Sequence, residues 1–147
     1  METRQLTLDD SGVLVEVFSA VLPEFPERLV DGAPASFLAD PTSFAFGAWD
    51  ATEPAGLAWG VQMRAPTGRL ITYLHQLDVR EQFRRRGVGS RLVAASMALA
   101  RDRGSTRFWL STGGHNDAAQ SLYESLGGER KPRGDVNFWW ELQPTTT

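Results

Sequence analysis

Residues 77–93 read LDVREQFRRRGVGSRLV, and this stretch decides the fold. An apolar run that ends at Val79 is followed by a charged loop with three consecutive arginines at 84–86, and the loop runs into Gly-Val-Gly at 87–89. From Val88 onward, apolar residues recur with helical spacing. The stretch therefore predicts a strand, a glycine-rich loop and a helix in direct succession.

This succession is typical of a site for a bound anion. The N–H groups of a first helical turn have no partner within the helix and carry a partial positive charge. Glycines let a large anion approach the backbone, and arginine side chains add bidentate ionic contacts. The chain contains neither a Gly-x4-Gly-Lys-Ser/Thr phosphate loop nor a Gly-x-Gly-x-x-Gly dinucleotide fingerprint. We therefore expect a pyrophosphate-like ligand at residues 84–90.

The whole chain has the composition of one soluble globular domain, which we assign to residues 1–147. It contains no cysteine, which excludes disulfides and thiolate metal sites, and its two histidines, His75 and His115, are too far apart in sequence to indicate a metal site. We expect no bound metal. The sequence has no apolar run of 18 residues and no apolar signal region, so we expect a cytoplasmic protein without membrane contact.

Charge is divided unevenly along the chain. Residues 1–63 hold ten acids and two bases, a net charge of −8, whereas residues 64–147 hold eight acids and thirteen bases, a net charge of +5. This division predicts two surfaces with different partners, or is simply solvation of a charged surface. One short arginine run in a chain of pI ≈ 5.4 does not indicate nucleic-acid binding.

Hydrophobic periodicity predicts an α/β domain with a mixed sheet. The predicted order is strand, helix, three strands, helix, strand, helix, strand, with at least one parallel pair among the last strands. The second of the two longer C-terminal helices should begin with a capping box formed by Asp117 and Gln120. Predicted strands cover residues 4–8, 43–49, 55–64, 69–79, 106–112 and 136–143, and predicted helices cover residues 11–22, 88–103 and 116–127.

Two segments resemble the signatures of the Gcn5-related N-acetyltransferase (GNAT) superfamily. The first is Gln/Arg-x-x-Gly-x-Gly/Ala after a strand that ends in a hydrophobic-x-Val, and it is matched by Arg84, Arg85, Arg86, Gly87, Val88 and Gly89. The second is Asn-x-x-Ala-x-x-Leu-Tyr-x-x-x-Gly, and it is matched by Asn116, Ala119, Leu122, Tyr123 and Gly127. The resemblance covers residues 70–142. It implies a central mixed sheet flanked by helices and acetyl-CoA as co-substrate.

The same resemblance implies roles for individual residues. Backbone groups of Leu77 and Val79 would pair with the pantetheine arm, and the N–H groups of Arg85 to Ser90 would hold the pyrophosphate. Asn116 would contact the pantetheine, and Tyr123 would lie near the thiol sulfur.

Transfer of an acetyl group to an amine needs a neutral nitrogen and a stabilised leaving thiolate. The phenol of Tyr123 suits the second task. Helical spacing alone favours a core tyrosine with a satisfied hydroxyl, and the surrounding signature favours the functional role. His75 is the candidate base, because histidine can accept a proton near neutral pH. Period-two alternation puts His75 on one face of the strand with Tyr73, Leu77 and Val79. The same alternation puts Asp78 on the other face. A histidine that only packs, or a water chain to an acid, is the alternative.

The acceptor is predicted from charge and from a looser resemblance. In this fold the first helices wall the acceptor site, and residues 8–32 are rich in acids, so a small cationic amine is expected. The chain is similar to aminoglycoside 3-N-acetyltransferases in FLADPTSFAFGAWD (residues 37–50) and LYESLG (122–127). WLSTGGHNDAAQSLYESLG (109–127) is similar to ribosomal-protein alanine acetyltransferases, which leaves a protein N-terminus or lysine as a second acceptor. A CoA-binding sensor without catalysis is a third alternative.

Five tryptophans lie on predicted strands, where the default expectation is a core position. Trp139 and Trp140 are adjacent and must point to opposite faces of a strand. One of them is therefore available for the acceptor pocket or for a homodimer contact.

Overall fold

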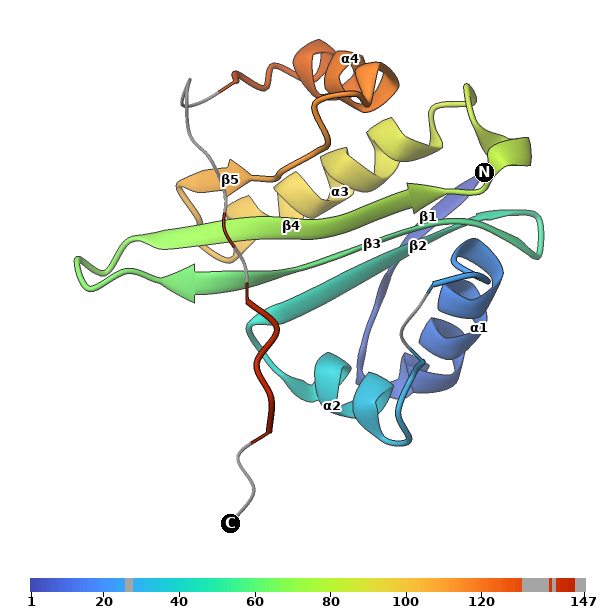
Figure 1. The fold of residues 1–147 in the computed structure, drawn as a ribbon, viewed down its shortest axis with the longest axis horizontal. Helices are drawn as coiled ribbons and strands as arrows, with labels where there is room; N and C mark the ends of the chain where they lie inside the picture. Colours follow the sequence, from blue (N-terminus) through green and yellow to red (C-terminus); the bar gives the residue numbers. More distant parts are fainter. Residues whose placement is uncertain (26–27, 131–137, 139, 145–147) are drawn as a thin grey trace.

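The computed structural model describes residues 1–25, 28–130, 138 and 140–144. Its centre is a five-stranded sheet with the spatial order β1-β2-β3-β4-β5 (Figure 1). The strands are β1 (Glu2–Leu6), β2 (Ser43–Asp50), β3 (Glu53–Arg64), β4 (Leu70–Val79) and β5 (Arg107–Trp109). The first four pair antiparallel, and β4 and β5 pair in parallel. The mixed sheet expected from the sequence is confirmed.

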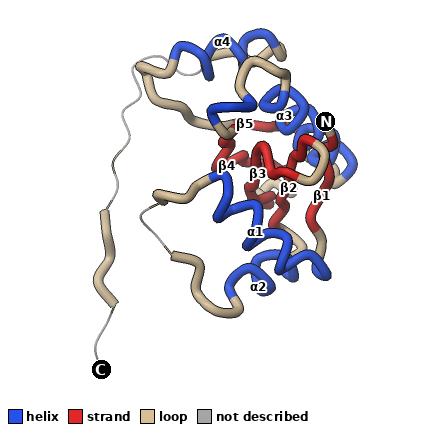
Figure 2. The backbone as a smooth tube through the Cα atoms, turned by 90° about the vertical axis from the view of Figure 1, so that its right-hand side faces the viewer, coloured by secondary structure: helices blue, strands red, loops and turns tan. Residues whose placement is uncertain are grey.

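Helices cover both faces of the sheet (Figure 2). One face carries α1 (Ser11–Val21) and α2 (Ala33–Ala39), and the other carries α3 (Val88–Asp102), with α4 (Asp117–Ser125) above α3. Short 3-10 turns precede α1 and α3 at η1 (Leu8–Asp10) and η2 (Glu81–Phe83). Because the sheet is buried on both faces, its central strands read as nearly continuous apolar runs.

Two hydrophobic clusters hold these layers together. Under α3, buried Val88, Leu92 and Val93 pack against sheet residues that include Phe44 and Leu74. Under α1 and α2, a second cluster forms; its fully or mostly buried members are Leu6, Leu14, Val17, Val21, Ala45 and Leu57. The predicted helical stripes of α1 and α3 therefore face the sheet, as amphipathic spacing requires. The end of α3 also follows the prediction, with Gly104 at φ +89° after the last turn.

Two predicted strands differ from the structure. The strand expected at 106–112 is reduced to Arg107–Trp109, because pairing with β4 extends only from Ile71 to Tyr73. The strand expected at 136–143 is not observed. Residues 136, 137 and 139 lie outside the described residues, and residues 138 and 140–143 are in no strand. The side chains of Phe138, Trp140 and Leu142 are 76%, 75% and 87% exposed, so no neighbouring layer buries this segment.

Candidate functional site

A cavity of about 780 Å³ opens where β4 and β5 part. The two strands pair only through Ile71–Tyr73 and Arg107–Trp109, and beyond this point the cavity is lined by residues 74–79 of β4 and by residues 110–112. The start of α3 and the inner face of α4 complete its walls. We refer to this space as the β4–β5 cavity. Its lining contains these predicted site residues: His75, Leu77, Val79, Arg84, Arg85, Gly87, Val88, Gly89, Ser90, Asn116 and Tyr123.

The glycine-rich loop presents an open helix N-terminus to this cavity. Gly87 is the N-cap of α3 and has φ +78°, a left-handed conformation that favours glycine, and it makes no side-chain capping hydrogen bond. The N–H groups that follow it therefore have no side-chain cap to satisfy them. Arg85 also has a positive φ, +63°, which is strained for a residue with a side chain. Such turns aim successive backbone N–H groups at one point, which suits an anion.

The three arginines of the loop point to different places. The Nε of Arg84 donates to the carbonyl oxygen of Val79 at 3.2 Å, and both Arg84 and Arg85 line the β4–β5 cavity. The side chain of Arg86 instead pairs with Asp50 at 3.1 Å and lies over the ring of Phe83. The cavity lining does not include Arg86. Arg86 is therefore the one predicted cofactor residue that does not line the cavity, because its side chain is paired with Asp50.

Gly89 lets α4 lie close to α3. A Cβ built on Gly89 would lie 3.0 Å from the Cδ2 atom of Leu122, which is closer than ordinary van der Waals contact. A side chain at this position would require the end of the Leu122 side chain to shift. The second glycine of the motif thus favours close packing of α4 on α3, in addition to backbone access.

The start of α4 differs from the predicted capping box. The N-cap is Asn116 rather than Asp117, and the Asn116 side-chain oxygen accepts from the N–H of Ala119 at 3.0 Å. The amide of Gln120 donates to the carbonyl of Gly113 at 3.1 Å instead of closing a box with Asp117. Asn116 therefore caps α4 in place of Asp117, because its side-chain oxygen accepts from a first-turn N–H. Asn116 also lies at the wall of the β4–β5 cavity.

Two titratable groups from opposite walls meet across the cavity. Burial raises the pKa of the Tyr123 phenol, and the charge of the nearby Asp78 carboxylate raises this pKa further. Burial likewise raises the pKa of Asp78, against the opposing effects of a hydrogen bond from Gln76 and the charge of Arg84. A phenol with a raised pKa keeps its proton at neutral pH and can donate it. Sequence alone offers no signal for the raised pKa of Asp78.

A β-bulge at His75 changes which side chains share a face. Trp59 pairs with Gln76 and Gly60 pairs with Leu74, so His75 is the extra residue in β4. The expected alternation therefore holds for Tyr73, whose ring contacts that of His75, and is wrong for Leu77 and Val79. Leu77 and Val79 pack toward α3, as Leu74 does, whereas His75 contacts Trp59 on the opposite face.

The residue opposite the bulge must be glycine. A Cβ on Gly60 would collide with the carbonyl oxygen of Tyr73 and would lie 2.7 Å from the ring of Phe44. The bulge thus depends on a residue of the neighbouring strand. It leaves His75 exposed at the edge of the cavity, in the region where the strands part.

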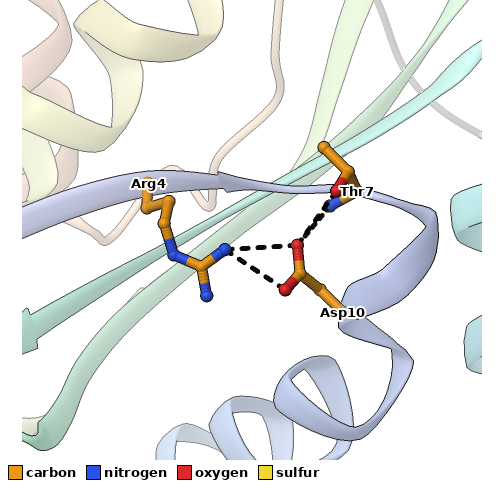
Figure 3. A network of polar contacts seen from close by, with 3 residues as sticks. All are labelled: Arg4, Thr7 and Asp10. Atoms are coloured by element: carbon orange, nitrogen blue, oxygen red, sulfur yellow. Dashed lines mark hydrogen bonds and ion pairs between the residues drawn. The ribbon is translucent and has the colours of Figure 1, made fainter.

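The acidic segment that precedes β2 is only partly available to a ligand. Asp10 accepts from the Arg4 guanidinium at 3.2 Å and from the N–H of Thr7 at 2.8 Å (Figure 3). The hydrogen bond from Thr7 is the main cause that holds the pKa of Asp10 below its usual value, and Arg4 lowers this pKa to a smaller extent. Glu24 lines a second, more open cavity of about 610 Å³ after α1, together with Arg28. Glu27 lies outside the described residues.

Among the described residues, no group of three or more His, Cys, Asp or Glu side chains is arranged to hold a metal ion. Within the same ranges, none of the helices has the length and apolar character needed to cross a bilayer.

The chain matches a family model described as the acetyltransferase (GNAT) family over residues 14–128. Two curated relatives come from Rattus norvegicus. N-acetyltransferase 8F1 is 31% identical over 77 residues, which is 52% of this chain and 35% of the relative. N-acetyltransferase family 8 member 2 is 37% identical over 65 residues, which is 44% of this chain and 29% of the relative. The matched region thus spans about a third of each relative's length.

Solved structures share the fold over nearly the whole chain. An aminoglycoside acetyltransferase, meta-AAC0020 from an uncultured soil metagenomic sample, in complex with sisomicin, superposes with a TM-score of 0.84 at 18% identity, covering 97% of this chain and 96% of that chain. Aminoglycoside N-acetyltransferase AAC(6')-Iy in complex with CoA has a TM-score of 0.74 at 21% identity, covering 95% and 93%. Ribosomal-protein-alanine N-acetyltransferase from Brucella melitensis biovar Abortus 2308 has a TM-score of 0.71 at 18% identity, covering 95% and 100%. The fold expected from the two signatures is confirmed.

Proposed function

Because the chain belongs to the acetyltransferase (GNAT) family, we propose that it is an acetyl-CoA-dependent N-acetyltransferase and that its co-substrate lies in the β4–β5 cavity. One observation carries this proposal: residues of both signatures, which are separated in sequence by the stretch from Gly89 to Asn116, line the same cavity. The volume of about 780 Å³ is within the range of ligand sites.

The cavity offers separate groups for the separate parts of acetyl-CoA. In our proposal the N–H groups of residues 85–90 hold the pyrophosphate at the start of α3, where the helix dipole and Arg84 favour negative charge. The backbone of Leu77 and Val79 pairs with the pantetheine arm, because this part of β4 has no recorded strand partner on its β5 side among the described residues. The Asn116 amide contacts the same arm from α4.

The reaction needs one proton donor and one proton acceptor. The amine nitrogen attacks the thioester carbonyl, a C–N bond forms, the C–S bond breaks, and the departing sulfur takes up a proton. In our proposal the Tyr123 phenol, which has a raised pKa, donates that proton to the sulfur. His75 accepts the proton that the amine loses, since it is exposed at the cavity edge. Asp78 is the second candidate, because it lines the same cavity.

The proposed acceptor is a primary amine of a small cationic molecule, and an aminoglycoside is the leading candidate. The net charge of −8 over residues 1–63, the half that includes α1 and α2, favours a cation. Similarity in fold to an aminoglycoside acetyltransferase supports this choice. A protein N-terminus or a lysine is the alternative acceptor, supported by similarity in fold to a ribosomal-protein-alanine N-acetyltransferase.

Release of the CoA thiol from acetyl-CoA tests the proposal directly. The purified protein should be assayed against aminoglycosides, polyamines and peptides with free N-termini. Thiol release that requires a cationic small molecule would support the proposed acceptor, and release with peptides alone would replace it by the protein acceptor. Tight CoA binding without thiol release for any amine would reject the enzyme and leave a CoA-binding sensor.

A further inference from the structure

A row of ring contacts crosses the sheet face that carries α1 and α2. Its rings run from α2 through β3 and β4 to β5, with centroid distances of 5.6 Å, 4.6 Å, 5.5 Å and 4.1 Å between successive members. The last of these pairs is stacked, with an angle of 26° between the two planes. We refer to these five residues as the aromatic row: Phe37, Trp59, His75, Tyr73 and Trp109.

The aromatic row is not part of the buried core. Trp109 is 40% exposed, His75 is exposed, and the other three members are half-buried. The sequence-based expectation of a core position is therefore wrong for Trp109. Phe37 and Trp59 pack against the cluster under α1 and α2, so the exposed part of the row is His75 and Trp109, with half-buried Tyr73 between them. An exposed aromatic surface beside a cavity suits a bound ligand.

The middle of the row, at His75, adjoins the proposed reaction centre. His75 is a member of the row and also lines the β4–β5 cavity, as does its neighbour Gln76. The indole N–H of Trp59 donates to the Gln76 side-chain oxygen at 2.8 Å, which fixes the orientation of the indole ring. Tyr73 and Trp109 are direct cross-strand partners, so their stack is held by the sheet. Because these rings are already held in place, the protein side chains lose little conformational freedom when a ligand binds to them.

No arginine of the described residues lies over a ring of the row, although Tyr73 and Trp109, which are stacked, cover one face of each other. Among the described residues, the arginines recorded over aromatic rings lie over Trp49 and Phe83, which are outside the row. The face of an aromatic ring attracts an ammonium group, and this attraction is strongest for the indole of Trp. The same flat face can also stack against another ring. The row therefore has the chemistry to bind a ligand that carries both a positive charge and a ring.

We propose that the aromatic row is the acceptor subsite of the proposed acetyltransferase, and that it selects ring-bearing cationic amines over open-chain ones. This inference rests on the proposed function. The reacting nitrogen lies at His75, in the middle of the row and next to the cavity, and the ring of the acceptor lies against Tyr73 and Trp109 on the β5 side.

Binding in the presence of CoA tests the subsite without acetyl transfer, because CoA carries no acetyl group. Calorimetry should compare sisomicin, whose rings are aminated sugars, with tryptamine, whose ring is aromatic, and with spermine, an open-chain polyamine. Tyr73→Leu and Trp109→Leu remove a ring and keep an apolar side chain. Trp140→Leu is the matched control, because Trp140 is exposed and its ring lies beside Phe138, outside the row.

Each row variant should weaken binding of a ring-bearing amine about tenfold, the order expected for a lost cation–π or stacking contact. Spermine affinity should stay within about twofold of the parent value, and Trp140→Leu should change none of the three. A preference for tryptamine over sisomicin would identify an aromatic ring as the recognised group.

The subsite is refuted if both row variants bind sisomicin and tryptamine as the parent does, if spermine loses as much affinity, or if neither ring-bearing amine binds. These outcomes are separate from failure of the proposed function. Ring-dependent binding without thiol release from acetyl-CoA would reject the enzyme and keep the subsite. Efficient acetylation of spermine or peptides with no ring dependence would keep the enzyme and reject the subsite.

Discussion

Replacement of Gly87 by glutamate should abolish tight CoA binding. Gly87 has φ +78° and no atom within 4 Å of a built Cβ, so a glutamate would fit sterically but would be strained. A left-handed conformation costs an L-residue about 1–2 kcal/mol. The new carboxylate would lie at the start of α3, where the pyrophosphate is proposed to bind. Loss of even one charge-assisted contact, about 2 kcal/mol, corresponds to roughly thirtyfold weaker binding.

Gly68→Glu is a matched control for this experiment. Gly68 lies in the β3–β4 turn, has φ +87° and likewise has no atom within 4 Å of a built Cβ, but it does not line the β4–β5 cavity. Both variants should therefore lose similar stability, about 2–8 °C in melting temperature. Calorimetric titration with CoA should separate them, since only Gly87→Glu should lose affinity. Equal CoA affinity of the two folded variants would refute the assignment of the loop as the pyrophosphate site.

Three further outcomes are expected. Tyr123→Phe should lower kcat about 100-fold, the scale of a lost general acid, while calorimetric CoA affinity stays unchanged; turnover within about twofold would make Tyr123 a packing residue. His75→Gln should flatten the acidic limb of the pH–rate profile if His75 accepts the amine proton, and an unaltered limb would transfer that role to Asp78 or to water. Because burial raises the pKa of Asp78 in the folded protein, its ionisation costs stability as the pH rises through that pKa. Asp78→Asn should therefore melt at a higher temperature than the parent at about pH 7. The difference in melting temperature between the two proteins should disappear near about pH 3. A difference that does not depend on pH would contradict the raised pKa.

Charge attraction to the acceptor has its own signature. Attraction between exposed charges is screened over about 8 Å at physiological ionic strength. The apparent KM for a cationic amine should therefore rise with added salt while kcat changes little. A KM that does not respond to salt, or a preferred acceptor that is anionic, would reject the cationic acceptor and would leave the acetyltransferase proposal intact.

The sequence by itself determined the features that depend on neighbouring residues. The glycine-rich loop after Val79 predicted where α3 begins, because a helix start needs open N–H groups and a residue tolerant of positive φ. Helical spacing predicted α1, α3 and α4 within a few residues, and the change from period two to period 3.6 predicted a mixed sheet. Ten of the eleven predicted cofactor residues line one cavity, since both signatures place them at helix and strand ends.

Tertiary structure alone decided what depends on residues far apart in the chain. The bulge at His75 is set by pairing with Trp59 and Gly60, and it reverses the faces that alternation along one strand predicts. The length of β5 is set by where β4 stops pairing with it, and that ending opens the cavity. The raised pKa of Asp78 and the aromatic row likewise arise from burial and contacts between separate elements. Local patterns report backbone preference, whereas strand register and burial are properties of the packed sheet.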